Sequence, residues 1–236
     1  MILSATFNAL LETLPIKDRT VLYGQGETVS LVLNEVLCDV DVDTEYVYFP
    51  LTGFISLVVP TKGHAPLETG LVGNEGMLGA TLILDVSTAP ARGVVQGSGT
   101  ALRFTSSEFC IAMKNHPGLR RSINRYLYVL IAQQSYAITC THFHEVESRL
   151  ARWLLMIHDR TSGNLLQLTH SFLADMLGVQ RSAVTIAAGH LQKQNLISYS
   201  RGKIKVIDRL GLEGASCECY EGLSADYISQ FPYAKV

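Results

Sequence analysis

Hydrophobic positions follow two different patterns in the 236-residue chain, and the change between them falls near residue 105. From about residue 20 to 105, short apolar and β-branched runs recur, and eleven of the 19 glycines lie between and around them. Short apolar runs separated by glycine turns are typical of strands, so this part predicts a small β-barrel or roll. The expected strands lie at 29–33, 46–49, 54–59, 93–95 and 100–104.

The rest of the chain shows the three- and four-residue spacing of amphipathic helices. We expect a lead-in helix over 4–19 that ends at Pro15, a short helix over 108–114, and another over 145–159. A longer helix over about 119–137 carries a narrow apolar stripe, which could pack on the barrel of its own chain or pair with a second copy. Its length and central place favour pairing. The stripe consists of Leu119, Ile123, Tyr126, Leu127, Leu130, Gln134 and Ala137.

Residues 169–195 predict two short helices joined by a tight turn at Gly178, where glycine permits a positive φ. Leu173, Ala174 and Leu177 would face inward from the first helix, and a second apolar set would do so from the next helix. The outward face of the second helix carries Gln180, Arg181, Ser182 and Thr185, which suit the major groove of DNA. An ordinary helical hairpin with a solvated face is the alternative. The second inward set is Val179, Val184, Ala187 and Leu191.

Two short alternating runs, 196–200 and 204–207, follow this hairpin and flank Arg201, Gly202 and Lys203. They predict a basic β-hairpin, and such a wing would place Arg201 and Lys203 against phosphates. Thr169, His170 and Ser171 begin the first helix, where backbone N–H groups and hydroxyls can also hold a phosphate. We therefore expect a winged helix-turn-helix.

Charge is unevenly distributed although the net charge is only −2. The balance of basic and acidic residues is −7 over 1–100, +4 over 101–164, +4 over 165–210 and −3 over 211–236. A positive C-terminal part behind an acidic N-terminal part fits a DNA-binding module joined to a sensory or scaffold module.

The composition favours a folded cytoplasmic protein. Hydrophobic residues make up 47% of the chain, no apolar run is long enough to span a bilayer, and the N-terminus lacks a secretory pattern. Five scattered cysteines fit a reducing compartment better than a disulfide framework.

No catalytic motif groups a nucleophile with a base, and an enzyme is therefore not expected. Metal sites are not expected either. Cys217 and Cys219 form a lone CxC that we interpret as inert thiols, and His142, His144 and Glu145 are interpreted as solvated side chains at a helix start.

Three stretches carry a resemblance to a known family: VESRLARWLL from Val146, LADMLGVQRSAVT from Leu173, and LQKQNLI from Leu191. With the preceding roll and long helix, the chain resembles the CRP/FNR superfamily of bacterial transcription regulators over about residues 20–208. The resemblance implies an α+β chain with an N-terminal double-stranded β-helix (jelly roll) of the cyclic-nucleotide-binding type, a dimerisation helix and a C-terminal winged helix-turn-helix.

The resemblance also places Arg181 where family members contact a guanine. Ser182 stands where many have a glutamate, and Ile186, where some have a further arginine, would meet a thymine methyl or be buried.

The cyclic-nucleotide cassette of the family matches poorly. After Gly79, Ala80 stands where the ribose-binding glutamate is expected, and Pro90 stands where the phosphate-binding arginine is expected. Arg92 is close enough for a two-residue loop difference to bring it into a pocket. Cyclic AMP is not expected, because a buried ribose hydroxyl would lack its acceptor. The N-terminal cysteine cluster of the iron–sulfur members is also missing, since the first cysteine is Cys38.

We therefore expect a β-roll effector domain over 1–117, a dimerisation helix over 118–140, a winged helix-turn-helix over 141–210 and a C-terminal tail over 211–236. The expected function is a homodimeric transcription regulator that binds a palindromic site on double-stranded DNA, with an effector of unknown identity. RNA polymerase is a further candidate partner. The alternative is a ligand-binding or protein-interaction module whose helix-turn-helix does not bind DNA.

Overall fold

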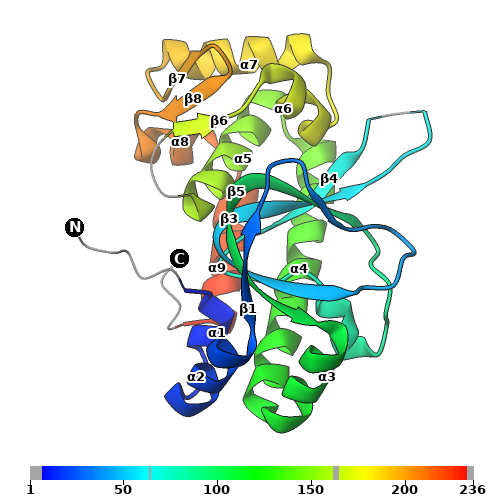
Figure 1. Ribbon diagram of the computed structural model, residues 1–236. Coiled ribbons are helices and arrows are strands. Elements are labelled where there is room, and N and C mark those ends of the chain that lie inside the picture. The colour runs from blue at the N-terminus through cyan, green and yellow to red at the C-terminus, as the bar shows by residue number, and fades with distance from the viewer. Residues whose placement is uncertain (1–6, 64, 162–164, 233–236) are drawn as a thin grey trace.

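The computed structural model describes residues 7–63, 65–161 and 165–232. It comprises an N-terminal β-domain, a long central helix and a C-terminal helical domain with its own small sheet (Figure 1). The sequence Ser162-Gly163-Asn164 predicts a turn, and these three residues lie outside the described part of the chain. No helix in the described chain is both long and apolar enough to cross a lipid bilayer.

The β-domain is an antiparallel sheet with strand order β1-β5-β3-β4, and β2 also pairs with β5. Two long strands replace the four short ones expected over 46–59 and 93–104. Its elements are α1 (Ala9–Glu12), α2 (Ile16–Gln25), β1 (Glu27–Leu31), β2 (Val36–Cys38), β3 (Tyr46–Val59), β4 (Leu67–Val72), the 3-10 helix η1 (Ala80–Leu84) and β5 (Arg92–Thr105).

Bulges explain why the two long strands looked interrupted in the sequence. The register of β3 against β5 shifts between Pro50 and Ile55. At this point a Cβ on Gly53 would lie 2.3 Å from the Gly97 carbonyl oxygen, and Gly53 has a φ of +74°. Glycine here permits a bend within a continuous strand, where the pattern had suggested a turn between two strands.

The N-terminal prediction of one helix over 4–19 is wrong in detail. Asn8 caps α1, and its buried side chain accepts hydrogen bonds from the backbone of Leu10 and Leu11. Pro15 then stands immediately before α2 instead of ending the helical segment. Proline has no N–H to donate and a fixed φ, which suits the start of a helix as well as its end.

The described residues of the C-terminal half form helices and one three-stranded sheet of order β6-β8-β7. The acidic tail after residue 208, to which the sequence assigned no structure, forms two helices. The elements are α3 (Ser106–Asn115), α4 (Pro117–Phe143), α5 (Val146–Arg160), β6 (Leu165–Gln167), α6 (His170–Leu177), α7 (Arg181–Lys193), β7 (Ile197–Ser200), β8 (Lys203–Val206), α8 (Arg209–Ala215) and α9 (Glu218–Gln230).

Helix α4 has two apolar faces, whereas the sequence suggested one. Leu119, Ile123 and Tyr126 of the predicted pairing stripe are buried within their own chain, so this part of the expected seam is wrong. Gln133 fixes the orientation of the helix, because its side-chain amide bonds both the N–H and the C=O of Leu71 on the edge strand β4, at 3.0 and 3.3 Å. A second face remains exposed and includes Ile131 and Ile138, which are 64% and 73% exposed.

The C-terminal domain packs directly on the β-domain. A continuous core joins Phe54, Val58 and Leu71 of the sheet with the buried residues of α5, α6 and α7. At its edge, Glu68 of β4 accepts hydrogen bonds of 2.6 Å from the indole N–H of Trp153 and the hydroxyl of Ser56. Burial raises the pKa of Glu68 to about 7, and these two hydrogen bonds oppose the shift.

This raised pKa predicts a pH-dependent stability. Between pH 4.5 and 7 the folded chain holds a proton on Glu68 that the unfolded chain has lost, so the free energy of unfolding should fall as pH rises through this window. Glu68→Gln does not titrate, and its stability relative to the parent should increase by about 1–3 kcal/mol from pH 5 to pH 8. Urea unfolding at both pH values measures this. The same change at exposed Glu45 should show no such increase, and a pH-independent difference for Glu68→Gln would contradict the prediction.

Candidate nucleic-acid interface

Helices α6 and α7 form the predicted helix-turn-helix around Gly178. Thr169 caps α6 by accepting a hydrogen bond from the Phe172 N–H, and Gly178 ends the helix with a φ of +64°. The N–H of Val179 then bonds the Ala174 carbonyl at 3.0 Å, which closes the helix in the manner of a left-handed C-cap. All the residues predicted to face inward are buried except Val179, which is partly buried and packs on the same core. The local sequence thus specifies this turn.

The outer face of α7 presents its first turns to solvent. Gln180, Arg181, Ser182 and Thr185 are exposed, and Figure 1 shows α7 at the end of the molecule remote from α2 and α3. Arg181 makes no ion pair with any residue that the structure describes. Ile186 is 60% exposed, so of the two roles considered for it, burial is excluded.

The side chain of His170 is buried, although the sequence predicted that it belongs to a phosphate-binding surface. Its ring is buried, stacks on Tyr199 with centroids 4.0 Å apart, and places Nδ1 3.0 Å from the Thr185 hydroxyl. That hydroxyl itself donates to the Arg181 carbonyl, so His170 Nδ1 must be the donor to it. Burial, with a contribution from Arg181, lowers the pKa of His170. The neutral ring therefore connects α6, α7 and the wing, and only its backbone N–H remains at the start of α6.

Strands β7 and β8 form the wing and meet in a two-residue turn. Arg201 and Gly202 have φ values of +49° and +76°, as a type I′ turn requires at both central positions. Arg201 is a non-glycine residue in the left-handed region, which carries a steric cost of about 1–2 kcal/mol. Lys203 is exposed on β8, and Lys205 lies on the same face two residues later. The sequence interpretation missed Lys205, although strict alternation along the strand could have identified it.

Side chains of helix α5 bond both helices of the helix-turn-helix. The buried guanidinium of Arg149 donates to the Leu177 carbonyl at the end of α6. Glu147 accepts from the side chains of His190 and Gln194 near the end of α7, at 2.9 and 3.0 Å. Both helices of the hairpin are therefore tied to α5 by side chains, as well as by the shared core.

The three residues considered for an effector site have different structural surroundings. Gly79 has a φ of +91° and precedes η1, and Ala80 is buried. Arg92 instead makes two hydrogen bonds with the Asp39 carboxylate, at 3.0 and 2.8 Å. This ion pair occupies the guanidinium that was expected to reach a ligand phosphate.

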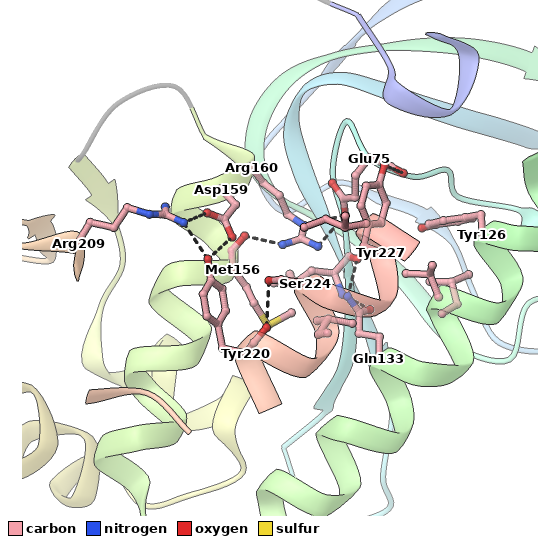
Figure 2. Close-up of a pocket in the computed structure, with 15 residues that line it drawn as sticks. Glu75, Tyr126, Gln133, Met156, Asp159, Arg160, Arg209, Tyr220, Ser224 and Tyr227 are labelled. Atoms are coloured by element: carbon pink, nitrogen blue, oxygen red, sulfur yellow. Dashed lines mark hydrogen bonds and ion pairs between the residues drawn. The ribbon is translucent and has the colours of Figure 1, made fainter. Parts of the chain in front are cut away.

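A different cavity of about 230 Å³ lies where the β-domain, α4, α5 and α9 meet (Figure 2). Arg160 forms one wall and pairs with Glu75, with both side chains buried and Nη2 2.7 Å from Oε1. Asp159 pairs with Arg209 at 2.7 Å on another side, and the Tyr227 hydroxyl donates to the Glu75 carbonyl. No local motif marks this cavity, because its walls come from five separate parts of the chain.

Comparisons with known proteins agree with this geometry. Residues 148–215 match the family model of the Crp-like helix-turn-helix domain. The structure of FixK2 from Bradyrhizobium japonicum is 15% identical and covers 81% of this chain and 98% of its own, with a TM-score of 0.69. A putative transcriptional regulator of the crp/fnr family from Eubacterium rectale is 16% identical and covers 87% and 96%, with a TM-score of 0.65.

The chain has the fold of the CRP/FNR regulators, and residues 148–215 are similar to the Crp-like helix-turn-helix domain. The c-di-GMP responsive global regulator CLP of Xanthomonas campestris has the same fold, at 13% identity over 81% of this chain and 99% of its own, with a TM-score of 0.64. No curated protein matches the sequence. The fold prediction and the resemblance are thus confirmed, while the roles of individual residues remain predictions.

Proposed function

We propose that the chain is a homodimeric transcription regulator that recognises a palindromic site on double-stranded DNA. The observation that carries this proposal is the position of Arg181, which is the first residue of α7, exposed, and without an ion-pair partner among the described residues. A guanidinium at the start of a recognition helix can make a bidentate contact with O6 and N7 of guanine. Ser182 and Ile186 on the same face would modify the base preference at neighbouring positions.

The wing supplies the phosphate contacts in this proposal. Arg201, Lys203 and Lys205 are exposed and close together on one hairpin, and phosphate contacts supply the sequence-independent part of DNA affinity. The left-handed conformation of Arg201 supports a role for its side chain. Asparagine or glycine would fit this turn position with less strain, and strain of this kind is often retained at functional sites.

The exposed face of α4 supports dimer formation. Residues 124, 127, 131, 134, 138 and 141 follow one another at alternating intervals of three and four, the spacing of the a and d positions of a coiled coil. All are exposed except Leu127, which is partly buried. Two parallel copies of this helix would set the two recognition helices on the same side of the dimer, as two half-sites about one DNA turn apart require.

We further propose that an effector binds in the cavity beside Glu75 and Arg160. This cavity touches both the β-domain and α5, so a ligand in it can stabilise one relative position of the two domains.

The DNA-binding role is tested with Arg181→Ala. A duplex enriched from a random library by the parent protein serves as the probe. We expect its affinity to fall by about 1–3 kcal/mol and base preference to relax at one position in each half-site. Lys17→Ala, at the far end of the molecule on α2, is the matched control. Unchanged affinity and unchanged base preference would show that α7 does not read the DNA as proposed.

The wing is tested with Arg201→Asn. Asparagine tolerates the left-handed region, so the free energy of unfolding should stay equal or rise by about 0.5–1 kcal/mol. Affinity for all duplexes should nevertheless decrease, and the slope of log K against log salt should become shallower by about one unit. Lys17→Asn should change neither DNA property. A salt slope equal to that of the parent would remove Arg201 from the phosphate contacts.

The dimer is tested with Ile131→Glu. Because Ile131 is 64% exposed in the single chain, the substitution should leave the protomer folded while placing two carboxylates in the proposed seam. Light scattering should change from dimer to monomer mass at micromolar concentration. Ile16→Glu changes an isoleucine that is 73% exposed on α2 and should remain dimeric. A dimer that tolerates Ile131→Glu, or a parent protein that is already monomeric, would contradict the proposed interface.

A further inference from the structure

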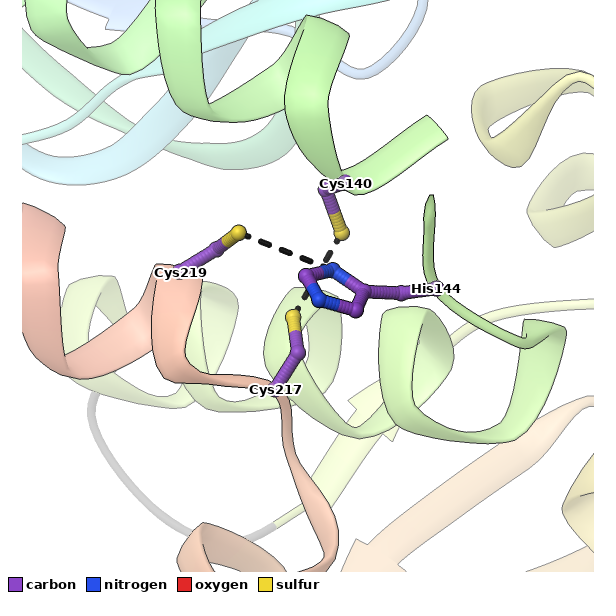
Figure 3. A group of neighbouring side chains, drawn as sticks. All are labelled: Cys140, His144, Cys217 and Cys219. Carbon is purple, nitrogen blue, oxygen red and sulfur yellow. Dashed lines mark hydrogen bonds between the residues drawn. The ribbon is translucent and has the colours of Figure 1, made fainter. Parts of the chain in front are cut away.

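Three cysteines and one histidine that are distant in the sequence converge at the junction of α4, α5 and α9 (Figure 3). Cys140 and His144 are four residues apart at the end of α4. Cys217 and Cys219 are the residue before α9 and its second residue. The four potential ligand atoms all lie within 4.8 Å of one another. The sequence suggested that the CxC pair is a lone motif. In the structure it lies beside Cys140 and His144.

Two of the six distances between the potential ligand atoms match those of a tetrahedral metal site. The Sγ atoms of Cys140 and Cys217 are 3.5 Å apart, and Sγ of Cys219 is 3.7 Å from Nδ1 of His144. A zinc ion with Zn–S of about 2.3 Å and Zn–N of about 2.0–2.1 Å places neighbouring ligand atoms about 3.5–3.8 Å apart. The sulfur–sulfur distance is too long for a disulfide, and the three thiols are free. An iron–sulfur cluster would have to fit several iron and sulfide atoms between the ligands, which this spacing does not allow.

His144 is oriented as a metal ligand usually is. Its Nδ1 faces the sulfur atoms, while its Nε2 lies 3.1 Å from a carboxylate oxygen of Glu218. A hydrogen bond from Nε2–H to this carboxylate keeps the lone pair of Nδ1 directed at the cluster. Metal-ligating histidines commonly have a carboxylate or carbonyl partner of this kind on the other ring nitrogen.

The surrounding charge fits three thiolates around a divalent ion. Cys140, Cys217 and Cys219 are buried, at 1%, 7% and 1% exposure. Arg152 and Arg149 place positive charge near the Cys140 sulfur. Arg152 is buried, has an unbonded Nε and makes no ion pair within the described chain. Three thiolates, a neutral histidine and a divalent cation have a formal charge of −1, which would compensate such an arginine.

We propose that Cys140, His144, Cys217 and Cys219 bind one zinc ion. Protein side chains would fill all four coordination positions of the ion, and three of these side chains are buried. This is the arrangement of a structural zinc site. Helix α9 packs along α4, and His144 immediately precedes the turn into α5. The ion therefore fastens the C-terminal helix to the connection between the long helix and the DNA-binding domain. This inference does not depend on the proposed function.

Metal content of the full chain tests the proposal. The protein is purified under anaerobic reducing conditions, dialysed against zinc and then against metal-free buffer, and analysed by mass spectrometry for zinc and iron. We expect one zinc ion per chain in the parent and in Cys110→Ser, which changes a cysteine outside the cluster. Cys219→Ser should retain much less zinc, and His144→Cys should retain more zinc than His144→Ala because cysteine restores a fourth ligand.

Two further measurements keep the proposal testable if a variant folds poorly. Zinc returned to the chelator-stripped parent should raise Tm by about 8 °C when free zinc is about 1,000-fold above Kd. Cobalt added in place of zinc should give the visible absorption of a tetrahedral thiolate site. A parent with no bound zinc, equal zinc in Cys219→Ser and Cys110→Ser, or iron with the absorption of an iron–sulfur cluster would each overturn the proposal.

Discussion

The orientation of α4 about its own axis is the constraint on which the rest of the molecule depends. The edge strand β4 would otherwise leave the backbone N–H and C=O of Leu71 buried without partners, which is costly. The Gln133 amide bonds both groups, and a single helical residue can do so in only one rotational setting. That setting turns Leu119, Ile123 and Tyr126 toward the chain's own core and Ile131 and Ile138 toward solvent. The same contact also places Cys140, two turns further along, against α9.

A second set of contacts determines how the helix-turn-helix domain packs on the sheet. The Glu75–Arg160 pair is almost fully buried, and such a pair is costly to disrupt on one side only, by about 3–5 kcal/mol. It therefore specifies one mutual position of the β-domain and α5 more than it adds net stability. Trp153 and Glu68 act at the other end of the same interface, where the indole N–H reaches the carboxylate. Helix α5 also bonds both helices of the hairpin. Its contacts with the β-domain therefore fix the orientation of the exposed face of α7 relative to the sheet as well.

The helix-turn-helix and the wing could be predicted from the sequence because their signals are local. Gly178 between two apolar periodicities, and Arg201-Gly202 between two alternating runs, each specify a turn within a few residues. The rotation of α4 could not be predicted in this way. Both of its faces are apolar, and only the long-range contact with Leu71 distinguishes them. The bend at Gly53 has a similar origin, since glycine marks a turn and a bulge equally well in sequence.

The contacts of the acidic tail could not be predicted from local sequence patterns. Cys217 lies 77 residues from Cys140 in the chain, and Cys219 lies two residues further, so no short stretch of sequence connects these cysteines to a site. In the fold, Leu223, Tyr227 and Phe231 are buried, and α9 closes the cavity beside Arg160. Helix α9 is thus held near its start by the cysteine cluster and near its end by Tyr227 on the loop of Glu75. A ligand in the cavity would contact α9 between Tyr220 and Ile228, and an ion in the cluster would bind at the start of the same helix. The cluster lies outside the cavity, so loss of the ion would loosen one wall of the cavity while leaving its polar residues in place. Helix α9 is therefore the physical element through which the two sites would be coupled.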